Sequence, residues 1–174
     1  MNINWAVEIT RLCQLKRKLN SADPEKLWPY TLPEVGVSEE QIELAEKHIS
    51  HRLPNDHRHF LKHANGWKSF FHDINLFGTG DLQGGANFLR ALKLIESLDS
   101  SVLHKSHLRK GDLLPIAVSI NDIDLIVNVI SGKLENKVIW FAGGEIERFQ
   151  SFSEFFVGMI ELTIEDICEL ENLT

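Results

Sequence analysis

Cysteine is scarce in this sequence, since only Cys13 and Cys168 among 174 residues carry thiols. They lie near opposite ends of the chain, each within an apolar helical pattern, and neither belongs to a CxxC motif. The sequence therefore lacks the signature of a disulfide framework, of a thiolate metal site and of a dithiol redox centre. We expect both residues to be ordinary reduced thiols in the protein core.

Long apolar runs are missing as well. No stretch approaches the roughly 18 consecutive apolar residues that a membrane-spanning helix needs. The first ten residues include Glu8 and lack the basic start and apolar core of an export signal. We therefore expect a cytoplasmic protein without a membrane partner. At this length and with 43% hydrophobic residues, the chain can bury one sizeable core, which indicates a single globular domain.

The sequence also has no excess of basic residues. Its formal net charge is -7, and the acid is concentrated toward the C-terminus. Residues 1–110 hold 15 Lys and Arg against 13 Asp and Glu, whereas residues 111–174 hold 3 against 12. A basic face is needed to neutralise phosphates, so nucleic acid is disfavoured as a ligand. The balance favours a basic partner, or no partner and a solvated acidic surface.

The first 36 residues divide into a helix and a connector. Apolar residues recur at helical spacing from Trp5 to Leu19, which predicts an amphipathic helix. Three prolines then interrupt regular structure between residues 21 and 35, and we expect Trp28 and Tyr30 to fix this connector against the core. Residues 1–36 should thus pack on a domain formed by residues 37–174.

A helical hairpin is predicted next. SEEQ, which begins at Ser38, matches a capping box, so a helix should begin there and run to about residue 50. Pro54 suits the first turn of a second helix. Asn65-Gly66 supplies the left-handed stop of that helix.

The remaining residues switch between helical and strand patterns. Residues 74–77 predict a short strand before a glycine-containing turn, and SFSE at Ser151 opens a long helix with a second capping box. LLPIAVS, DLIVNVI and KVIWFAG are typical of an antiparallel meander. We predict an α+β fold in which N-terminal helices pack on a mainly antiparallel sheet with a closing C-terminal helix. Residues 86–98 predict a further helix that buries Phe88, Leu89, Leu92, Ile95 and Leu98.

Six histidines between His48 and His72 raise the question of a metal site. His59 and His63 share a helix face, but the segment HFLKH lacks the glutamate that zinc hydrolases place beside the first histidine of HExxH. The same segment is explained equally well as the solvated side of the second hairpin helix, where histidines and Arg58 alternate with buried apolar residues. We therefore predict no metal ligand, and a metal-dependent enzyme using this cluster is the least favoured function.

Other signatures of catalysis are incomplete. GTGDLQGG at residues 78–85 matches neither of the phosphate-binding glycine motifs, and no serine or cysteine stands in a nucleophile motif. We predict no catalytic residue and no cofactor. Two carboxylate pairs remain, Asp122 with Asp124 and Glu145 with Glu147. Side chains two residues apart on a strand point the same way, so each pair should form a local acidic spot.

The motifs, taken in order, resemble a known family. SEEQIELAEKHISHRLPNDHRHFLKHANG combines a capped helix, the step Leu53-Pro54, a helix ending Phe60-Leu61 and an asparagine-glycine stop. INLFGTGDL, LLPIA, DLIVNVI, KVIWFAG and SFSEFFVGMI follow. This series, from residue 37 to about residue 160, resembles the SUKH superfamily, which includes fungal cell-wall-assembly regulators and many bacterial immunity proteins. In that family an aromatic residue is more usual at the position of His57.

The resemblance implies a SUKH-like domain that binds a protein and performs no catalysis. Its members are similar to small cytoplasmic inhibitors that neutralise bacterial toxins, often nucleases. The charge balance agrees, because an acidic inhibitor can occupy a basic substrate groove. We predict an immunity protein that is a monomer or a weak homodimer and binds a basic toxin. Five carboxylates and two aromatic anchors are the predicted contact residues: Asp122, Asp124, Glu135, Glu145, Glu147, Trp67 and Trp140.

Two alternatives stay open at this point. The carboxylates can be merely solvated while both tryptophans fill the core. The protein can also be a non-catalytic intracellular adaptor or regulator built on the same fold, as the fungal members are.

Overall fold

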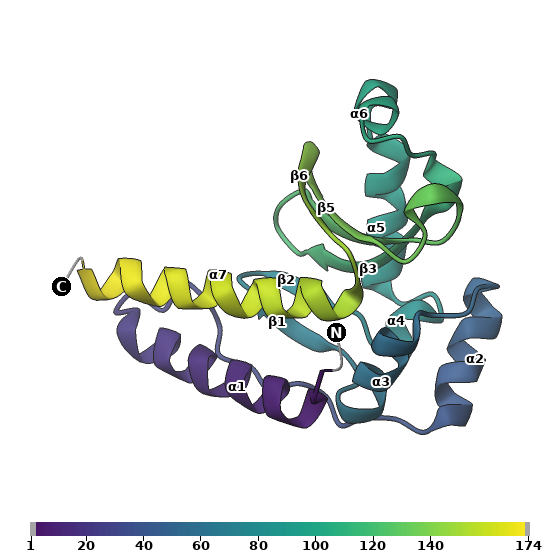
Figure 1. The fold of residues 1–174 in the computed structure, drawn as a ribbon. Helices are drawn as coiled ribbons and strands as arrows, with labels where there is room; N and C mark the ends of the chain where they lie inside the picture. Colours follow the sequence, from purple (N-terminus) through teal and green to yellow (C-terminus); the bar gives the residue numbers. More distant parts are fainter. Residues whose placement is uncertain (1–2, 173–174) are drawn as a thin grey trace.

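Six strands form one antiparallel sheet in chain order, from β1 to β6. The structure, a computed structural model, describes residues 3–172 and places helices on both sides of this sheet (Figure 1). The strands are β1 (Trp67–Phe71), β2 (Ile74–Leu76), β3 (Leu113–Ser119), β4 (Asp124–Val129), β5 (Val138–Ala142) and β6 (Gly144–Phe149). The helices are α1 (Trp5–Ala22), α2 (Glu39–Ile49), α3 (Asn55–His63), α4 (Thr79–Leu82), α5 (Ala86–Ser97), α6 (Ser100–Lys105) and α7 (Phe152–Asn172), with short 3-10 turns η1 (Lys110–Asp112) and η2 (Gly132–Leu134). The predicted α+β fold is confirmed.

The α2–α3 hairpin forms with the predicted helix starts, but α3 ends at His63 with Ala64 in an extended conformation, before the predicted left-handed stop at Asn65-Gly66. Ser38 is the N-cap of α2, and its backbone N–H donates to the side-chain oxygen of Gln41 at 3.1 Å. Pro54 precedes the first turn of α3. Gly66 then turns the chain into β1 with φ +84°, and a Cβ atom at this position would lie 2.5 Å from the backbone nitrogen of Gly78. Only glycine fits there, because both the backbone conformation and the space exclude a side chain.

Helices α1 and α7 lie side by side and run in the same direction (Figure 1). At their beginnings, the Trp5 ring contacts Phe152 and Phe156 with centroids 5.7 and 5.3 Å away. Near their ends, Lys18 pairs with Glu171 at 2.9 Å. The N-terminal helix is therefore packed along the C-terminal helix over most of its length.

Lys16 ties α1 to the sheet from within the core. Its side chain is buried, and its ammonium donates to the backbone carbonyls of Ser69 at 2.5 Å and Phe70 at 3.3 Å. Burial lowers the pKa of Lys16 to about 8. A residue that the helical pattern places among surface cations is thus a buried anchor.

The sheet separates two apolar layers. Helix α5 packs on β3 and β4, and the beginning of α7 covers the opposite face, where Phe155 contacts Phe149 with centroids 5.5 Å apart. Strand β3 is wholly buried and β4 nearly so. Cover on both faces explains why the apolar residues of these strands run on without strict alternation. Within residues 3–172, no helix combines the length and the apolar character needed to span a bilayer.

Several local predictions were wrong or incomplete. Leu89 and Leu92 are exposed, because α5 turns Ala91 and Ile95 toward the sheet instead. Cys168 is exposed as well, on the outer side of α7. Four elements were missed: β1, β6 and the short helices α4 and α6.

Candidate functional site

The meander brings three tight turns to one end of the sheet. In an antiparallel series, the β1–β2, β3–β4 and β5–β6 connections all fall at the same end, and the β4–β5 connection falls at the other. The two central residues of the β1–β2 turn are His72 and Asp73, since Phe71 pairs with Ile74. The carboxylate of Asp73 accepts the backbone N–H of Asn121 at 2.8 Å, which joins this turn to the β3–β4 turn.

A hollow of about 440 Å³ lies at this end of the sheet. We call it the acidic pocket. Its floor is apolar and includes Phe71, Ile74 and, from α7, Leu162. Four carboxylates and two indole rings complete it: Asp73, Asp122, Asp124, Glu147, Trp28 and Trp140.

Asp124 is a partly buried carboxylate of the pocket. Its Oδ1 accepts the indole N–H of Trp140 at 2.7 Å. Partial burial raises the pKa of Asp124, the nearby charges of Asp122 and Asp73 raise it further, and the Trp140 hydrogen bond acts in the opposite direction. The ionised form of this carboxyl group is therefore held in an unfavourable field that a positive charge would relieve.

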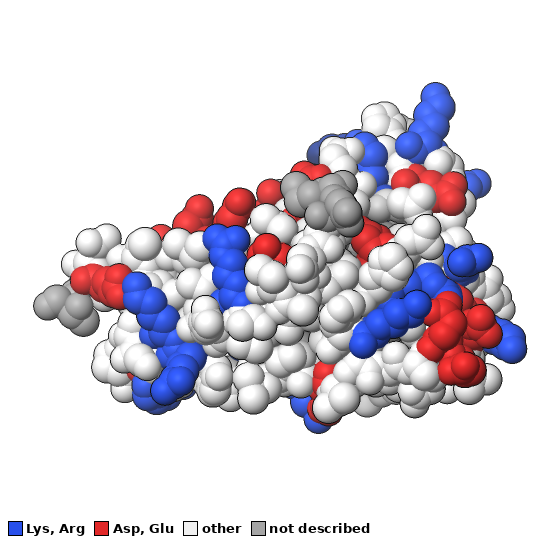
Figure 2. All heavy atoms as spheres, turned by 60° about the horizontal axis from the view of Figure 1, so that its bottom comes forward, with Lys and Arg blue, Asp and Glu red and all other residues white. Residues whose placement is uncertain are grey.

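Among the described residues, no Lys, Arg or His side chain forms an ion pair with the four carboxylates of this pocket. The guanidinium of Arg90 lies beside the β3–β4 turn, but it donates to the backbone carbonyls of Ser119 and Asp122 at 2.8 and 2.7 Å. Elsewhere, on the face drawn in Figure 2, cations lie in small groups with acidic side chains next to them.

A stack of rings forms one wall of the pocket. The His72 imidazole lies between Trp28 and Phe71, with centroids 4.2 and 4.0 Å away, and its Nε2 contacts Asp166 at 2.8 Å. Trp28 is itself held by the buried carboxylate of Asp23, which accepts backbone N–H groups along the turn from residue 25 to residue 28. The wall is thus fixed from both sides before any partner arrives.

Exposed isoleucines surround the acidic pocket. Ile120 and Ile123 in the β3–β4 turn are 49% and 52% exposed, and Ile146 in β6 is 55% exposed. Three large aliphatic side chains at one end of a sheet are more than the scattered single residues that a free surface normally carries. Indole rings and exposed aliphatic groups are typical of a protein-binding surface, and the carboxylates add a charge that can attract a basic partner.

The structure brings four of the seven predicted site residues together. Asp122, Asp124, Glu147 and Trp140 all line the acidic pocket, and Trp140 pairs directly across the strands with Glu147. Glu135 does not join them, because it lies in the β4–β5 connection at the opposite end of the sheet.

Trp67 must be removed from the predicted anchors. Only 1% of its surface is exposed, and its indole N–H donates to the carbonyl of Thr31 at 3.1 Å. Strand β1 points this ring into the core, where it meets Phe70 at 5.8 Å. A partner could reach it only by unpacking the protein.

Glu145 and Glu147 point to opposite faces, contrary to the expectation that they form one acidic spot. The register shifts within this strand pair, so that Trp140 faces Glu147 while Phe141 faces Glu145. A bulge of this kind inserts one residue and reverses the direction of the following side chains. Glu145 accordingly leaves the pocket and makes a double hydrogen bond with Arg148 at 2.8 and 2.7 Å.

Trp28, His72 and Asp73 are among the pocket residues that were not predicted from the sequence. Trp28 was expected to fix the connector, which it does, but its place in a pocket wall depends on contacts with a distant turn. Asp73 and His72 form the two-residue turn of a hairpin whose first strand was missed. A clearer strand signal at residues 67–71 would have placed both residues at the same end as Asp122.

The histidine cluster is dispersed in the structure. His48, His59 and His63 are exposed, and within residues 3–172 no group of three or more His, Cys, Asp or Glu side chains is arranged to hold a metal ion. His57 was wrongly assigned to the solvated side of α3. It is fully buried and stacks on Phe152 at 4.1 Å, which is the contact that an aromatic residue would make.

Arg58 was also wrongly placed in solvent. It is buried and forms ion pairs with Glu39 and Glu46 of α2. The sequence pattern of α3 gave the wrong prediction because two adjacent polar residues, His57 and Arg58, are both buried where α3 meets α2 and α7.

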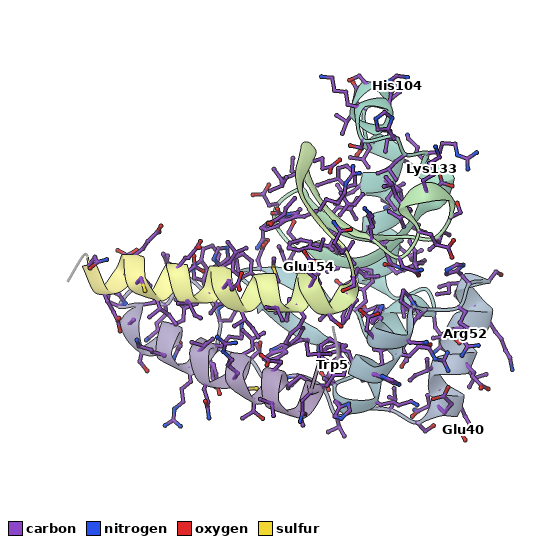
Figure 3. The ribbon with its side chains drawn as sticks, in the orientation of Figure 1. Trp5, Glu40, Arg52, His104, Lys133 and Glu154 are labelled. Carbon is purple, nitrogen blue, oxygen red and sulfur yellow. The ribbon has the colours of Figure 1, made fainter. Side chains whose placement is uncertain are left out.

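A larger hollow, about 640 Å³, lies beneath α6. His104 and Lys133, labelled in Figure 3, are on its two sides. Its arginines are already neutralised, since Arg109 donates to Asp112 and Arg148 to Glu145. Size alone favours this hollow, but uncompensated charge favours the acidic pocket as the functional site.

Comparison with known families identifies the matched part of the chain. Residues 36–158 match the model of the SMI1 / KNR4 family (SUKH-1). The matched region includes the α2–α3 hairpin, the whole sheet and the beginning of α7. No curated protein shows significant sequence similarity to the chain. The acidic pocket takes its carboxylates from the matched region, whereas Trp28 and Leu162 lie outside it.

Proposed function

The chain belongs to the SMI1 / KNR4 family (SUKH-1), and from that premise we propose that it is an immunity protein. It binds a cognate bacterial toxin in the cytoplasm and neutralises it by protein–protein contact, without catalysis. The proposed toxin is a basic protein, and a nuclease domain is the toxin class that we favour. The acidic pocket and its isoleucine rim provide the contact surface.

The uncompensated charge of the acidic pocket is the observation that carries this proposal. Within residues 3–172 these four carboxylates form no ion pair. Partial burial, and after it the nearby charges of Asp122 and Asp73, raises the pKa of Asp124, so the ionised form of this carboxyl group is disfavoured in the free protein. A catalytic or substrate groove that binds nucleic acid has the complementary charge. Association would bring cations to these carboxylates and exclude substrate phosphate from the groove.

The surroundings of the pocket supply the remaining features of an inhibitor surface. Charge steers the encounter and raises the association rate, while affinity comes from a few buried anchors. Trp140 is partly exposed and held rigid by Asp124, which suits it as an anchor. Ile123 and Ile146 add apolar area at the rim.

Co-expression tests this function directly. The chain would be produced in bacteria together with the toxin encoded beside it, and growth would be scored alongside recovery of a stable complex. We expect rescue of growth and a complex that dissociates as salt increases. The double variant Asp122→Lys with Glu147→Lys should lose both, whereas Glu43→Lys, an exposed change on α2, should lose neither. Absence of rescue and complex with the unmodified chain would direct the search to the adaptor function.

A further inference from the structure

We infer that the acidic pocket receives an arginine side chain of the partner, and that the N-terminal segment outside the matched family region completes the receptor through Trp28. This inference deepens the proposed function, because it names the part of the toxin that enters the pocket. It rests on the cavity, its ring walls and its charge together.

The two indole rings narrow the choice of guest. Carboxylates alone attract any cation, including solvent ions, but Trp28 and Trp140 also line the cavity. Indole faces attract cations, and among side chains the planar guanidinium combines ring stacking with several hydrogen-bond donors in one plane. Arginine therefore fits this combination better than lysine or a metal ion.

The arrangement of the acids suits a group with several donors. Asp122 comes from the β3–β4 turn, Asp124 from the beginning of β4, Asp73 from the β1–β2 turn and Glu147 from β6. A guanidinium has five N–H donors and can engage more than one carboxylate at once. The apolar floor, with Leu162 and Ile74, can cover the aliphatic part of the same side chain.

The N-terminal segment contributes a wall that the matched region by itself does not have. Trp28 lies eight residues before the start of that region, at residue 36, and reaches the pocket by stacking on His72. Asp23 fixes its position through three backbone N–H groups. Recognition of the guest thus depends on residues that relatives need not share.

Nuclear magnetic resonance of the full-length, ¹⁵N-labelled chain tests the inference. The probes are three capped tripeptides, acetyl-Gly-Arg-Gly-amide and its lysine and citrulline counterparts, of which citrulline has the shape of arginine without the charge. We expect saturable shifts of the Trp140 indole N–H and of the amides of residues 122–124 with the arginine peptide, with a dissociation constant on the order of 1 mM. The citrulline peptide should bind about tenfold more weakly than the arginine peptide, and the lysine peptide should also bind more weakly than the arginine peptide.

Three variants locate the binding groups. Trp28→Ala should weaken binding of the arginine peptide by about threefold to tenfold, and Asp124→Asn should weaken it by a similar factor. Glu43→Gln removes an acid of α2 and should leave this binding unchanged. Trp28→Phe keeps an aromatic ring against His72 and serves as the second variant if the alanine change disturbs the fold, which the spectrum of the free protein reports.

The outcomes separate this inference from the function it deepens. Equal binding of the citrulline peptide, shifts confined to another surface, or the absence of saturable shifts would each overturn it. If the toxin is neutralised while the arginine peptide does not bind, only this inference fails. If the peptide binds at the pocket but no toxin is neutralised, the receptor is supported and the immunity function fails.

Discussion

The α2–α3 hairpin and the acidic pocket both gather charged side chains, yet the hairpin satisfies its charges internally and the pocket does not. In the hairpin, buried Arg58 is paired with Glu39 and Glu46. The carboxylate of Asp56 accepts the backbone N–H and the hydroxyl of Ser153 at 2.8 and 3.0 Å, which fixes the beginning of α7. In the pocket, four carboxylates share one cavity, and none of them forms an ion pair within residues 3–172.

The difference separates charges that hold the fold from charges that remain available for a partner. Removing one member of a buried pair leaves the other charge desolvated, so hairpin changes should lower stability. The pocket carboxylates accept hydrogen bonds but form no ion pair within the described residues, so their changes should alter binding more than stability. Four measurements can confirm or break this division.

Arg58→Ala should have the largest effect. It leaves the largely buried Glu46 without its cation, while Glu39 keeps its ion pair with Lys62 at 2.6 Å. We expect the free energy of unfolding to fall by about 3–5 kcal/mol. Urea denaturation measures the change. Arg52→Ala, an exposed arginine in the same hairpin, should remain within about 0.5 kcal/mol of the unmodified chain. Equal losses in the two variants would contradict a special role for the buried pair.

His57 should make the hairpin side sensitive to acid. Complete burial lowers the pKa of His57 to about 4, against the opposing effect of Asp56, while the unfolded chain keeps a value near 6.5. Because the unfolded state takes up the proton first, stability is fully present above pH 6.5 and is lost as pH falls toward 4. The loss should amount to about 3 kcal/mol.

His57→Phe provides the matched control for this pH dependence. Phenylalanine keeps the ring against Phe152 and has no proton to gain, so the stability difference between pH 7 and pH 4.5 should shrink by most of that amount. Chemical denaturation at both pH values measures it. An unchanged difference would show that other groups cause the acid sensitivity.

The double reversal Asp122→Lys with Glu147→Lys should act on the partner complex alone. We expect affinity for the toxin to fall at least about a hundredfold, which corresponds to about 2.7 kcal/mol, because attraction becomes repulsion. The melting temperature should hardly change, since both side chains are exposed. Calorimetric titration and thermal unfolding report the two quantities. A large fall in melting temperature would break the division between the regions.

Asp124→Asn should have the smallest effect on stability, and of the opposite sign. The pKa of Asp124 is raised in the folded protein, so its ionisation opposes folding at neutral pH, and this penalty disappears as pH falls below the unfolded value. Asparagine keeps an oxygen for the Trp140 indole. The unfolding free energy at pH 7 should therefore rise, by less than about 1 kcal/mol because the group is partly solvated. A decrease would show that the Trp140 hydrogen bond requires the charge.

The sequence predicted the elements whose signals are local. Ser38 and Pro54 act within a few positions of the helix starts that they predict, so both starts could be assigned without tertiary information. The end of α3 could not be placed in the same way, because the helix stops at His63 and Gly66 is required by its close approach to Gly78. Strand β1 escaped because its five residues follow the helix stop directly and include Lys68. Strand β6 was hidden because a bulge breaks its alternation.

The candidate site was predictable only in part, because it depends on how distant turns meet. Asp122, Asp124 and Glu147 could be selected by composition, but Asp73 joins them only through the alternation of the meander. Trp67 and Trp140 look alike as sequence, yet strand direction buries one and leaves the other at the pocket. His57 turns inward because it stacks on Phe152, which is distant in the sequence. Arg58 turns inward because it pairs with Glu39 and Glu46 on the neighbouring helix.

The contact of Trp5 with Phe152 and Phe156 bears on how the protein is made. Synthesis begins at the N-terminus, so α1 leaves the ribosome long before the helix that covers it exists. The core therefore closes only when the residues of α7 have emerged, and the same step brings Leu162 to the acidic pocket. If the protein acts as proposed, finished molecules would provide the protection, and nascent chains would add nothing until α7 has been released.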